Sequence, residues 1–350
     1  MNWTHLTSGR PCRDGLNWLE LCSPLKDKRV AVERDALASL ILDAPGLEHV
    51  RDSLVRHGLL EDTHQEDSLA RRDIRMAIRH WQERGWSSGI DWYLWSRRHT
   101  FTDDGANPNL ARRSTMVEYL KVAPCPTPPQ AQQRTRSLTS LSSSSPLGAT
   151  LMARRSQGEF VARSITLEQL SHVLTVGTSR MRAARSSISS DPLNLLSSHG
   201  CAFDVHVLVY DVTGLRAGRY FFEPERQLLE TRRLGRFCER ANDIFGGQPD
   251  QQFASALVLL AASFERYHWR YRHERALRNL YVDAGRVMNR LALSATSLGL
   301  QTGLTPLLRD SDARALLGLA DEDAAVVHSL TLGGCLRQPA AMNPTDCPST

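Results

Sequence analysis

The sequence lacks the features of a membrane-spanning, secreted or disulfide-linked protein. Its longest apolar run, residues 256–262, is far too short to cross a bilayer. The first residues show no positive charge followed by an apolar stretch, so we expect no secretory signal. The 7 cysteines are odd in number, scattered and without a C-x-x-C pair, which is typical of reduced thiols. These absences predict a cytoplasmic protein that does not bind membranes.

Common catalytic signatures are missing as well. The chain contains no G-x-G-x-x-G, no Walker loop, no G-x-S-x-G and no H-E-x-x-H. His268 and His273 are five residues apart, which is a poor spacing for two metal ligands on one helix face, and no cysteine is near them. We therefore expect no metal site.

The composition is that of an ordinary globular protein, with its excess charge confined to one segment. The chain has 350 residues, of which 41% are hydrophobic and 23% charged, and this length favours two domains. The net charge is +5, and residues 112–155 contain seven basic residues against one acidic residue, so the rest is close to neutral. Because this excess lies mostly on a linker, we interpret it as a solvated tether and expect no nucleic-acid binding.

A Pro- and Ser-rich stretch divides the chain. Residues 123–129 contain four prolines, which cannot continue a helix. Residues 137–146 have too little apolar content to form a core. We therefore predict four parts: an N-terminal domain over 1–110, a linker over 111–150, a second domain over 151–340 and a tail over 341–350.

The N-terminal part has the order of elements of a winged helix. Apolar spacing predicts helices over residues 33–43 and 47–57, separated by a turn at Pro45 and Gly46, with a strand after Gly58. In the second helix Arg51 and Arg56 are offset by Glu48 and Asp52, which favours binding of a protein or peptide over DNA.

A further helix is predicted in the N-terminal part over residues 71–84, with Trp81 on its apolar side. We interpret the aromatic residues that follow it, Trp92, Trp95 and Phe101, as core residues and not as a stacking platform.

The second part mixes strands and helices. Apolar, β-branched runs predict strands over residues 205–211, 218–222, 257–260 and 326–332. Thr166 and Gln169 form a capping-box pattern, and residues 274–298 predict one long helix that ends at Gly299. The small residues of this helix would let another helix approach, within the chain or from a second copy. The pattern predicts an α+β fold with a mixed sheet and a long central helix.

Two guanidiniums and a hydroxyl follow the linker directly, at Arg154, Arg155 and Ser156. Arginine forms bidentate, charge-assisted hydrogen bonds to phosphate, and a serine hydroxyl adds a donor. This triplet therefore indicates a phosphate-binding segment, although an exposed lead-in to a helix would have the same residues.

The series of motifs from Arg154 to Gly334 resembles the nitroreductase-fold, FMN-dependent dehydrogenases of the SagB and McbC type. These enzymes oxidise thiazolines and oxazolines to thiazoles and oxazoles in ribosomally made peptides. The resemblance covers about residues 110–340 and is strongest over 264–300, which is similar to the family's R-x-x-W-K-Y, D-A-G-H and A-x-x-L-G-L motifs. The N-terminal part and linker resemble longer members from cyanobactin and thiopeptide pathways.

The resemblance implies a set of cofactor contacts. FMN would bind through its phosphate to the Arg-Arg-Ser triplet, lie along a serine-containing loop, and receive a backbone N–H near N5 from a turn at residues 301–304. The long helix would form a homodimer interface, with each FMN between two subunits. The implied contacts are Arg154, Arg155, Ser156, Ser197, Ser198, Gly303, Leu304 and Arg337.

The chain departs from the family at two places. The family's loop tyrosine and the proline after it are Phe203 and Asp204 here, and its catalytic Lys-Tyr pair is Arg270 and Tyr271. Azoline oxidation needs a base to remove a proton. At neutral pH, deprotonating an arginine costs about 8 kcal/mol and a tyrosine about 4 kcal/mol. We therefore expect Tyr271 to be the base, with the Arg270 cation favouring the phenolate or serving only a structural role.

Three functions are compatible with these features. The first is an FMN-dependent azoline dehydrogenase that acts on a modified precursor peptide, with a cyclodehydratase complex as a candidate assembly, and is reoxidised by oxygen. The second is an NAD(P)H-dependent flavin reductase of nitro or ene groups. The third is a catalytically silent subunit that binds a peptide or a cyclodehydratase.

Overall fold

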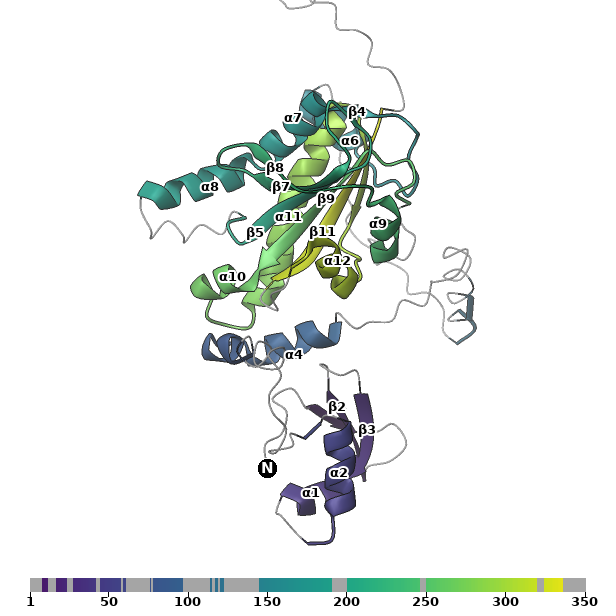
Figure 1. Cartoon of the computed structure of the whole chain (residues 1–350), viewed down its shortest axis with the longest axis vertical. Coiled ribbons are helices and arrows are strands. Elements are labelled where there is room, and N and C mark those ends of the chain that lie inside the picture. The colour runs from purple at the N-terminus through teal and green to yellow at the C-terminus, as the bar shows by residue number, and fades with distance from the viewer. Residues whose placement is uncertain are drawn as a thin grey trace, which may run out of the picture. The chain divides into compact units, whose positions relative to one another are not determined.

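The computed structural model describes the chain in two compact units. The residues described are 8–11, 17–23, 28–41, 45–57, 59–60, 76, 78–96, 114, 117–118, 120–122, 145–190, 200–245, 250–319 and 324–335. One unit, the N-terminal unit, comprises Met1–His99, Tyr267–Asn279 and Asp321–Asp323; the second unit comprises Thr100–Arg266, Leu280–Ala320 and Ala324–Thr350 (Figure 1). Among the described residues, no helix is long and apolar enough to cross a membrane.

The N-terminal unit begins with a sheet that the sequence analysis missed. Strands β1 (Ser8–Pro11), β2 (Trp18–Ser23) and β3 (Lys28–Glu33) pair antiparallel in that order. Helices α1 (Arg34–Ile41) and α2 (Glu48–Arg56) follow, close to their predicted ranges. The core of this unit is formed by Leu21, Val32, Leu40, Leu54, Leu59 and Leu60.

A cluster of aromatic side chains lies elsewhere in the N-terminal unit, around α4 (Ser87–Ser96). The Trp81 ring stacks on Tyr93, with 5.7 Å between centroids, and Trp86 lies edge-on to His268 at 4.1 Å. Burial lowers the pKa of His268 to about 3, so its imidazole is neutral. The prediction that Trp92 is a core residue was wrong, because this side chain is 53% exposed. The side chains of Trp95 and Phe101 lie outside the described part of the chain.

The second unit is organised by a six-stranded sheet with the order β10-β11-β9-β5-β7-β8. Every pairing in this sheet is antiparallel, so the mixed sheet expected from the sequence was wrong. The one parallel pairing among the described residues joins two short strands outside it, β4 (Ile165–Thr166) and β6 (Val212–Thr213). The six strands are β5 (Phe203–Val209), β7 (Gly218–Glu223), β8 (Leu228–Leu234), β9 (Ala256–Ser263), β10 (Gln301–Thr305) and β11 (Ala324–Gly333).

The predicted position of one strand is confirmed, and one predicted turn is corrected. Strand β9 lies inside the sheet between β5 and β11, and seven of its eight residues are buried, as expected for a central strand. Residues 301–304, predicted as a turn, instead belong to strand β10, which pairs with β11 from Gln301 opposite Gly333 to Thr305 opposite Ser329.

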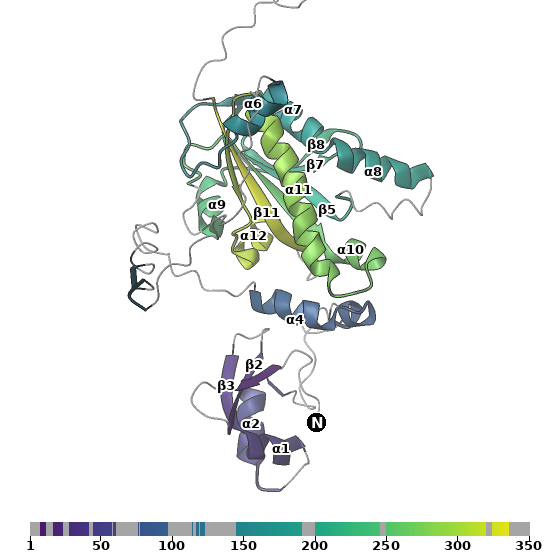
Figure 2. The ribbon, with the colours of Figure 1, turned by 180° about the vertical axis from the view of Figure 1, so that it is seen from behind.

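Helices cover both faces of this sheet (Figures 1 and 2). On one face α9 (Cys238–Phe245) and α12 (Asp310–Leu317) pack in one apolar cluster with Leu208, Leu257 and Leu259 of the sheet. On the other face runs α11 (Ala276–Ser297), the long helix that the sequence predicted. The remaining helices are α6 (Pro146–Ala153), α7 (Leu167–Gly177), α8 (Ser179–Ser190) and α10 (Phe264–Arg270). Helix α6 thus runs across the boundary expected at residue 150.

Local sequence signals explain where helix α7 begins and where helix α11 ends. The Thr166 hydroxyl accepts a hydrogen bond from the Gln169 amide while the Gln169 side chain accepts one from the Thr166 amide, so the predicted capping box is confirmed. Helix α11 is followed by Gly299 at φ +72°, a left-handed conformation that favours glycine.

Helices α7 and α11 approach each other closely at the end of α7. A Cβ atom added at Gly177 would lie 2.9 Å from the Cα of Leu291. The Gly177 carbonyl also accepts a hydrogen bond of 3.3 Å from the Arg290 guanidinium. The small residue therefore sets the distance between the two helices.

We predict that Gly177→Ala destabilises the second unit. The new methyl would meet backbone, which cannot rotate away, so we expect a loss of about 1–3 kcal/mol in the free energy of unfolding. Thermal or urea unfolding of the full chain measures this loss. Gly158→Ala is the control, because no heavy atom lies within 4 Å of its added Cβ. Equal stability of the two variants would contradict the close helix contact.

Candidate functional site

The Arg-Arg-Ser triplet lies directly after helix α6, and Arg154 is the C-cap residue of that helix. Arg154 is half-buried, whereas Arg155 and Ser156 are exposed. The Arg154 guanidinium is 3.4 Å from the Ser156 hydroxyl, and the Arg155 guanidinium donates to the carbonyls of Met152 and Arg154 at 2.8 and 2.9 Å. Within the described part of the chain neither guanidinium forms an ion pair with a carboxylate. Two adjacent cations therefore remain available to an anion.

Hydrogen bonds hold this triplet against strand β10. The Thr302 hydroxyl donates to the Arg155 carbonyl at 2.8 Å, and the Gln157 amide donates to the Thr302 carbonyl at 2.8 Å. The side chain of Gln301 donates to that of Gln157 at 2.8 Å and accepts from the Val161 amide at 2.9 Å. Thr302 and Gln301 are buried, at 2% and 4% exposure. The backbone of β10 therefore determines where the triplet lies.

The structure therefore brings together two groups of residues that the sequence assigned to one cofactor. Gly303 is buried and Leu304 half-buried, both on β10 immediately after the residue that binds the triplet. The two groups, Arg154 to Ser156 and Gly303 to Leu304, are about 150 positions apart in the chain. Two hydrogen bonds to Thr302, the residue before Gly303, connect them in the structure. The sequence analysis missed Thr302, Gln301 and Gln157, because no local pattern indicates which residues support a distant segment.

Two glycines at the end of β11 allow the following segment, residues 157–164, to lie against the sheet. A Cβ at Gly333 would lie 2.5 Å from the Phe160 ring, and a Cβ at Gly334 would overlap the Arg163 backbone. The Arg163 guanidinium donates to the Cys335 carbonyl at 2.9 Å. Any larger side chain at either glycine would displace the segment that follows the triplet.

The predicted base, Tyr271, follows α10 and belongs to the N-terminal unit. Its half-buried ring lies 4.7 Å from that of Tyr267, and its carbonyl accepts a hydrogen bond of 2.7 Å from the Trp86 indole. The backbone at Tyr271 is therefore fixed by the aromatic residues around α4. The side chain of Arg270 lies outside the described residues, as do Ser197, Ser198 and Arg337. The roles of all five stay predictions.

Asp204, the position at which the family has proline, has a structural role. Its carboxylate pairs with the Arg266 guanidinium and lies 3.5 Å from that of Arg185. Arg185 also donates to the neighbouring Phe203 carbonyl and lies 3.4 Å from the Glu225 carboxylate. These contacts attach helix α8 to strand β5.

Comparison with known proteins places residues 151–334 in one family. The family model for nitroreductases matches residues 151–334. The chain is 29% identical over 176 residues to a nitroreductase homologue of Methanocaldococcus jannaschii, covering 49% of this chain and 83% of the relative. It is 23% identical over 332 residues to the trifolitoxin operon protein TfxC of Rhizobium leguminosarum bv. trifolii, covering 89% of each.

Two solved structures align with part of this chain. A nitroreductase homologue from Anabaena variabilis aligns with a TM-score of 0.46 and 26% identity, over 54% of this chain and 38% of that chain. A chain of the E. coli microcin synthetase McbBCD complex, with truncated pro-MccB17 bound, aligns with a TM-score of 0.48 and 14% identity, over 79% of this chain and 100% of that chain.

We predict that Thr302→Val loosens the triplet without removing any of its donors. Valine has a similar shape but cannot donate to the Arg155 carbonyl, so the segment should open more readily by about 1 kcal/mol. Amide hydrogen exchange of residues 155–161 should then be several-fold faster, and Thr302→Ser should restore the slower exchange. Identical exchange in Thr302→Val and the parent chain would contradict the supporting role of this hydroxyl.

Proposed function

The chain belongs to the nitroreductase family, and from that premise we propose that it is an FMN-dependent dehydrogenase of thiazoline and oxazoline rings. Its substrate would be a ribosomally made precursor peptide, and its product the corresponding thiazole or oxazole. The observation that carries the proposal is the Arg-Arg-Ser triplet, whose two guanidiniums pair with no carboxylate among the described residues and whose backbone is held on strand β10 through Thr302.

The residues present fit the phosphate of FMN. A phosphate monoester carries nearly two negative charges at neutral pH and three acceptor oxygens. Arg154 and Arg155 supply the charge and forked donors, and Ser156 supplies a hydroxyl within reach of the first guanidinium. Ser197, Ser198 and Arg337 would add further contacts. Gly303 and Leu304, on the strand that anchors the triplet, would face the isoalloxazine ring.

The proposed chemistry removes a hydride and a proton from the azoline ring. FMN, when bound, would accept the hydride and return the electrons to oxygen. The side-chain oxygen of Tyr271 would take the proton. The hydrogen bond from Trp86 to the Tyr271 carbonyl, at 2.7 Å, would fix the base in place.

Full-length similarity supports the assignment of a peptide substrate. The relative TfxC is matched over 89% of both chains, which includes the N-terminal unit as well as the nitroreductase-family unit. That protein belongs to an operon for trifolitoxin, and the SagB and McbC resemblance of residues 264–300 implies azoline oxidation. A cyclodehydratase that forms the azolines is the expected partner enzyme.

Exposed apolar side chains support a homodimer. Helix α6 has no buried residue, and its Leu147, Leu151 and Met152 are 64%, 53% and 65% exposed. Val282 of the long helix is 50% exposed. A second copy that covers these side chains would also close the cofactor site next to Arg154.

A nicotinamide-dependent nitro or ene reductase is the second candidate. It is favoured by the M. jannaschii relative, which is named for nitro reduction and matches 49% of this chain. Rapid bleaching of bound flavin by NADPH would support this reaction. A catalytically silent peptide-binding subunit is the third candidate. It is favoured by Arg270 and Asp204, which stand where the family that the sequence resembles has lysine and proline.

We predict that the triplet contributes to flavin affinity only through the phosphate. The purified chain should bind FMN, and Arg155→Met should weaken FMN binding by about 10- to 100-fold. Riboflavin, which lacks the phosphate, should bind both proteins equally. Flavin fluorescence quenching measures each affinity, with the exposed Arg180 changed to Met as the control. A chain that takes up no FMN, or equal losses for both flavins, would contradict the assignment.

We predict that Tyr271→Phe abolishes azole formation and leaves FMN affinity within about twofold of the parent. The phenyl ring keeps the packing on Tyr267 but has no oxygen to accept the proton. Mass spectrometry of an azoline-containing peptide should show that the loss of two hydrogens per ring no longer occurs. Azole formation at the parent rate would exclude Tyr271 as the base.

A further inference from the structure

Arginine side chains gather on one surface of the second unit, from strand β7 across β8 to the start of α9. Four of them are exposed and the fifth, on β7, is half-buried. The segment Thr231–Cys238 contains three of them and no carboxylate. The five side chains, which we call the arginine surface, are those of Arg219, Arg232, Arg233, Arg236 and Arg240.

Strand register and side-chain contacts place the arginines of the two strands on one face of the sheet. Arg219 lies directly opposite Leu208 on one side and Arg233 on the other, and residues directly opposite on antiparallel strands point to the same face. This face carries α9 and α12, because Leu208 packs in their apolar cluster. The Arg232 guanidinium lies 5.1 Å from the centre of the Phe221 ring, two residues after Arg219 on β7. The guanidiniums therefore share one surface.

Arg219 connects the arginine surface to the core. Its guanidinium donates to the Leu316 carbonyl at 2.8 Å, in the last turn of α12, where the helix dipole is negative. Its Nε is buried and has no hydrogen-bond partner among the described residues. Burial and the positive charge of neighbouring arginines, Arg233 first, lower the pKa of Arg219. Like charges opposite each other on neighbouring strands are destabilising, and carboxylates of a ligand would offset this repulsion.

The carboxylates of this region leave most of the arginine surface without an ion pair. Glu230 of β8 pairs with Arg232 at 3.0 Å. Glu239 and Asp243 lie on α9, but within the described part of the chain neither forms an ion pair with an arginine. The other three exposed arginines have no ion pair there either. Their charges are therefore available to carboxylates of another molecule.

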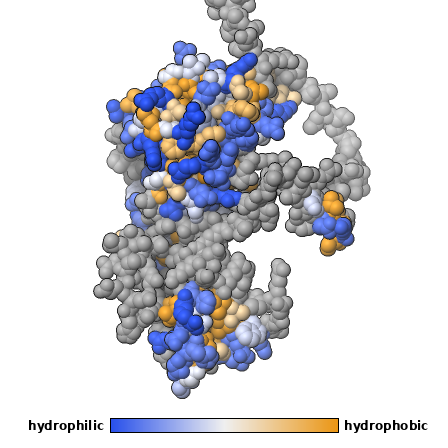
Figure 3. All heavy atoms as spheres, turned by 45° about the vertical axis from the view of Figure 1, so that its right-hand side comes forward, coloured by the Kyte–Doolittle hydropathy of each residue, from blue (hydrophilic) through white to orange (hydrophobic). Residues whose placement is uncertain are grey.

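The arginine surface lies at an edge of the six-stranded sheet. Strand β8 is the last in the order of that sheet, and within the described residues it pairs only with β7. Leu228 and Leu234, at the two ends of β8, are 44% and 41% exposed. On the face that Figure 3 shows, apolar side chains of the second unit likewise reach the surface among hydrophilic ones. Arginines along such an edge repel the same edge of a second copy and favour an acidic partner.

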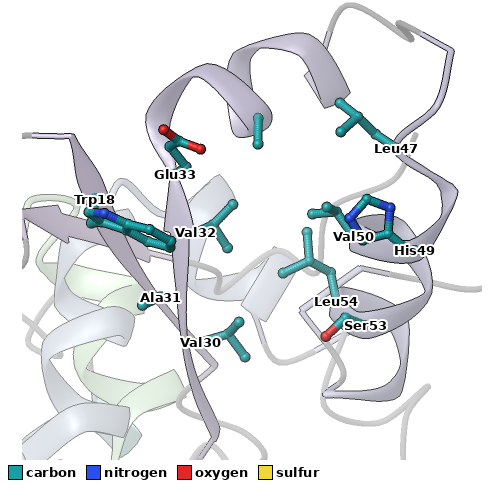
Figure 4. A pocket seen from close by; sticks show the side chains of 11 residues that line it. Trp18, Val30, Ala31, Val32, Glu33, Leu47, His49, Val50, Ser53 and Leu54 are labelled. Atoms are coloured by element: carbon teal, nitrogen blue, oxygen red, sulfur yellow. The ribbon is translucent and has the colours of Figure 1, made fainter.

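A cavity in the N-terminal unit has the opposite character and serves as a reference for locating an acidic ligand. It has a volume of about 410 Å³ and lies between strand β3 and helix α2 (Figure 4). Its lining is mostly apolar and includes the Glu33 carboxylate, and neither a lysine nor an arginine is among the lining residues. We therefore expect an acidic segment to avoid this cavity.

We propose that the arginine surface docks an extended acidic segment of a partner protein. Carboxylates of the segment accept charge-assisted hydrogen bonds from Arg233, Arg236 and Arg240, and its main chain lies along the β8 edge. A protein segment fits this surface better than a small anion, because the arginines are spread along a strand and the helix that follows it. The inference goes beyond the proposed function. Docking involves neither flavin nor Tyr271, so either proposal can fail while the other holds.

The probe is a dye-labelled 12-residue peptide of alternating glutamate and threonine, compared with the same peptide in which glutamine replaces glutamate. Fluorescence anisotropy with the full-length chain should show binding of the glutamate peptide only. Raising the salt concentration from about 0.05 to 0.5 M should weaken this binding more than about fivefold, because salt screens exposed charges. The bound peptide should slow amide exchange of residues 228–234 and leave that of residues 28–33, beside the cavity, unchanged.

Two variants of the arginine surface and two matched controls test the location. Arg233→Glu and Arg240→Glu, both at exposed positions, should each weaken binding of the glutamate peptide more than about fivefold. Arg180→Glu, at an exposed position on α8, and Arg134→Glu, in the basic linker, make the same charge change elsewhere. Both controls should keep the affinity within about twofold of the parent chain.

Several outcomes would overturn the proposal. Equal weakening by all four variants would show attraction to net charge alone, and bound peptide that leaves residues 228–234 unprotected would place it elsewhere. Displacement of the peptide by inorganic phosphate at equal ionic strength would assign the surface to a small anion. Single-stranded DNA that binds more tightly than the peptide, and is weakened by the same two variants, would assign it to nucleic acid. Protection of residues 228–234 without peptide that falls on dilution would assign the edge to a second copy of the chain.

Discussion

The candidate site depends on the guanidiniums of two neighbouring residues, Arg154 and Arg155. Among the described residues, no carboxylate pairs with either of them. Like charges on neighbouring residues repel each other, so other contacts must hold this segment in place. These contacts hold the backbone of the triplet and not its charged groups. The Thr302 hydroxyl donates a hydrogen bond to the Arg155 carbonyl, and the Gln157 amide donates one to the Thr302 carbonyl of β10. An anion bound by both guanidiniums, as the proposed function requires, would relieve this repulsion.

A few glycines let neighbouring segments pack closely, and this packing positions the triplet against the sheet. Gly333 and Gly334 let residues 157–164 lie against the end of β11, and Gly177 lets α7 approach α11. Strand β10 is then held between β11 on one side and the triplet on the other. The position of the triplet is therefore coupled to the position of Gly303 and Leu304, which the proposed function places at the flavin ring.

The sequence predicted the elements whose signals are local and strong. The apolar strand β9, the capping box at Thr166 and the long helix α11 follow from residue type and spacing within each segment. Strand β10 was missed because Gln-Thr-Gly-Leu-Thr has no alternation, and its strand character comes from pairing with β11. The direction of pairing in the sheet and the N-terminal sheet depend on contacts between distant segments. For the same reason the Arg-Arg-Ser triplet could be found from its chemistry, but its support by Thr302 could not.

The most direct test of the account is the phosphorus NMR spectrum of FMN bound to the full-length chain, followed from about pH 5 to 8. A phosphate held between two guanidiniums should remain a dianion, so its resonance should not shift through the range near pH 6 in which a free phosphate monoester gains its proton. A bound resonance that titrates like free FMN would place the phosphate in solvent and contradict the central claim.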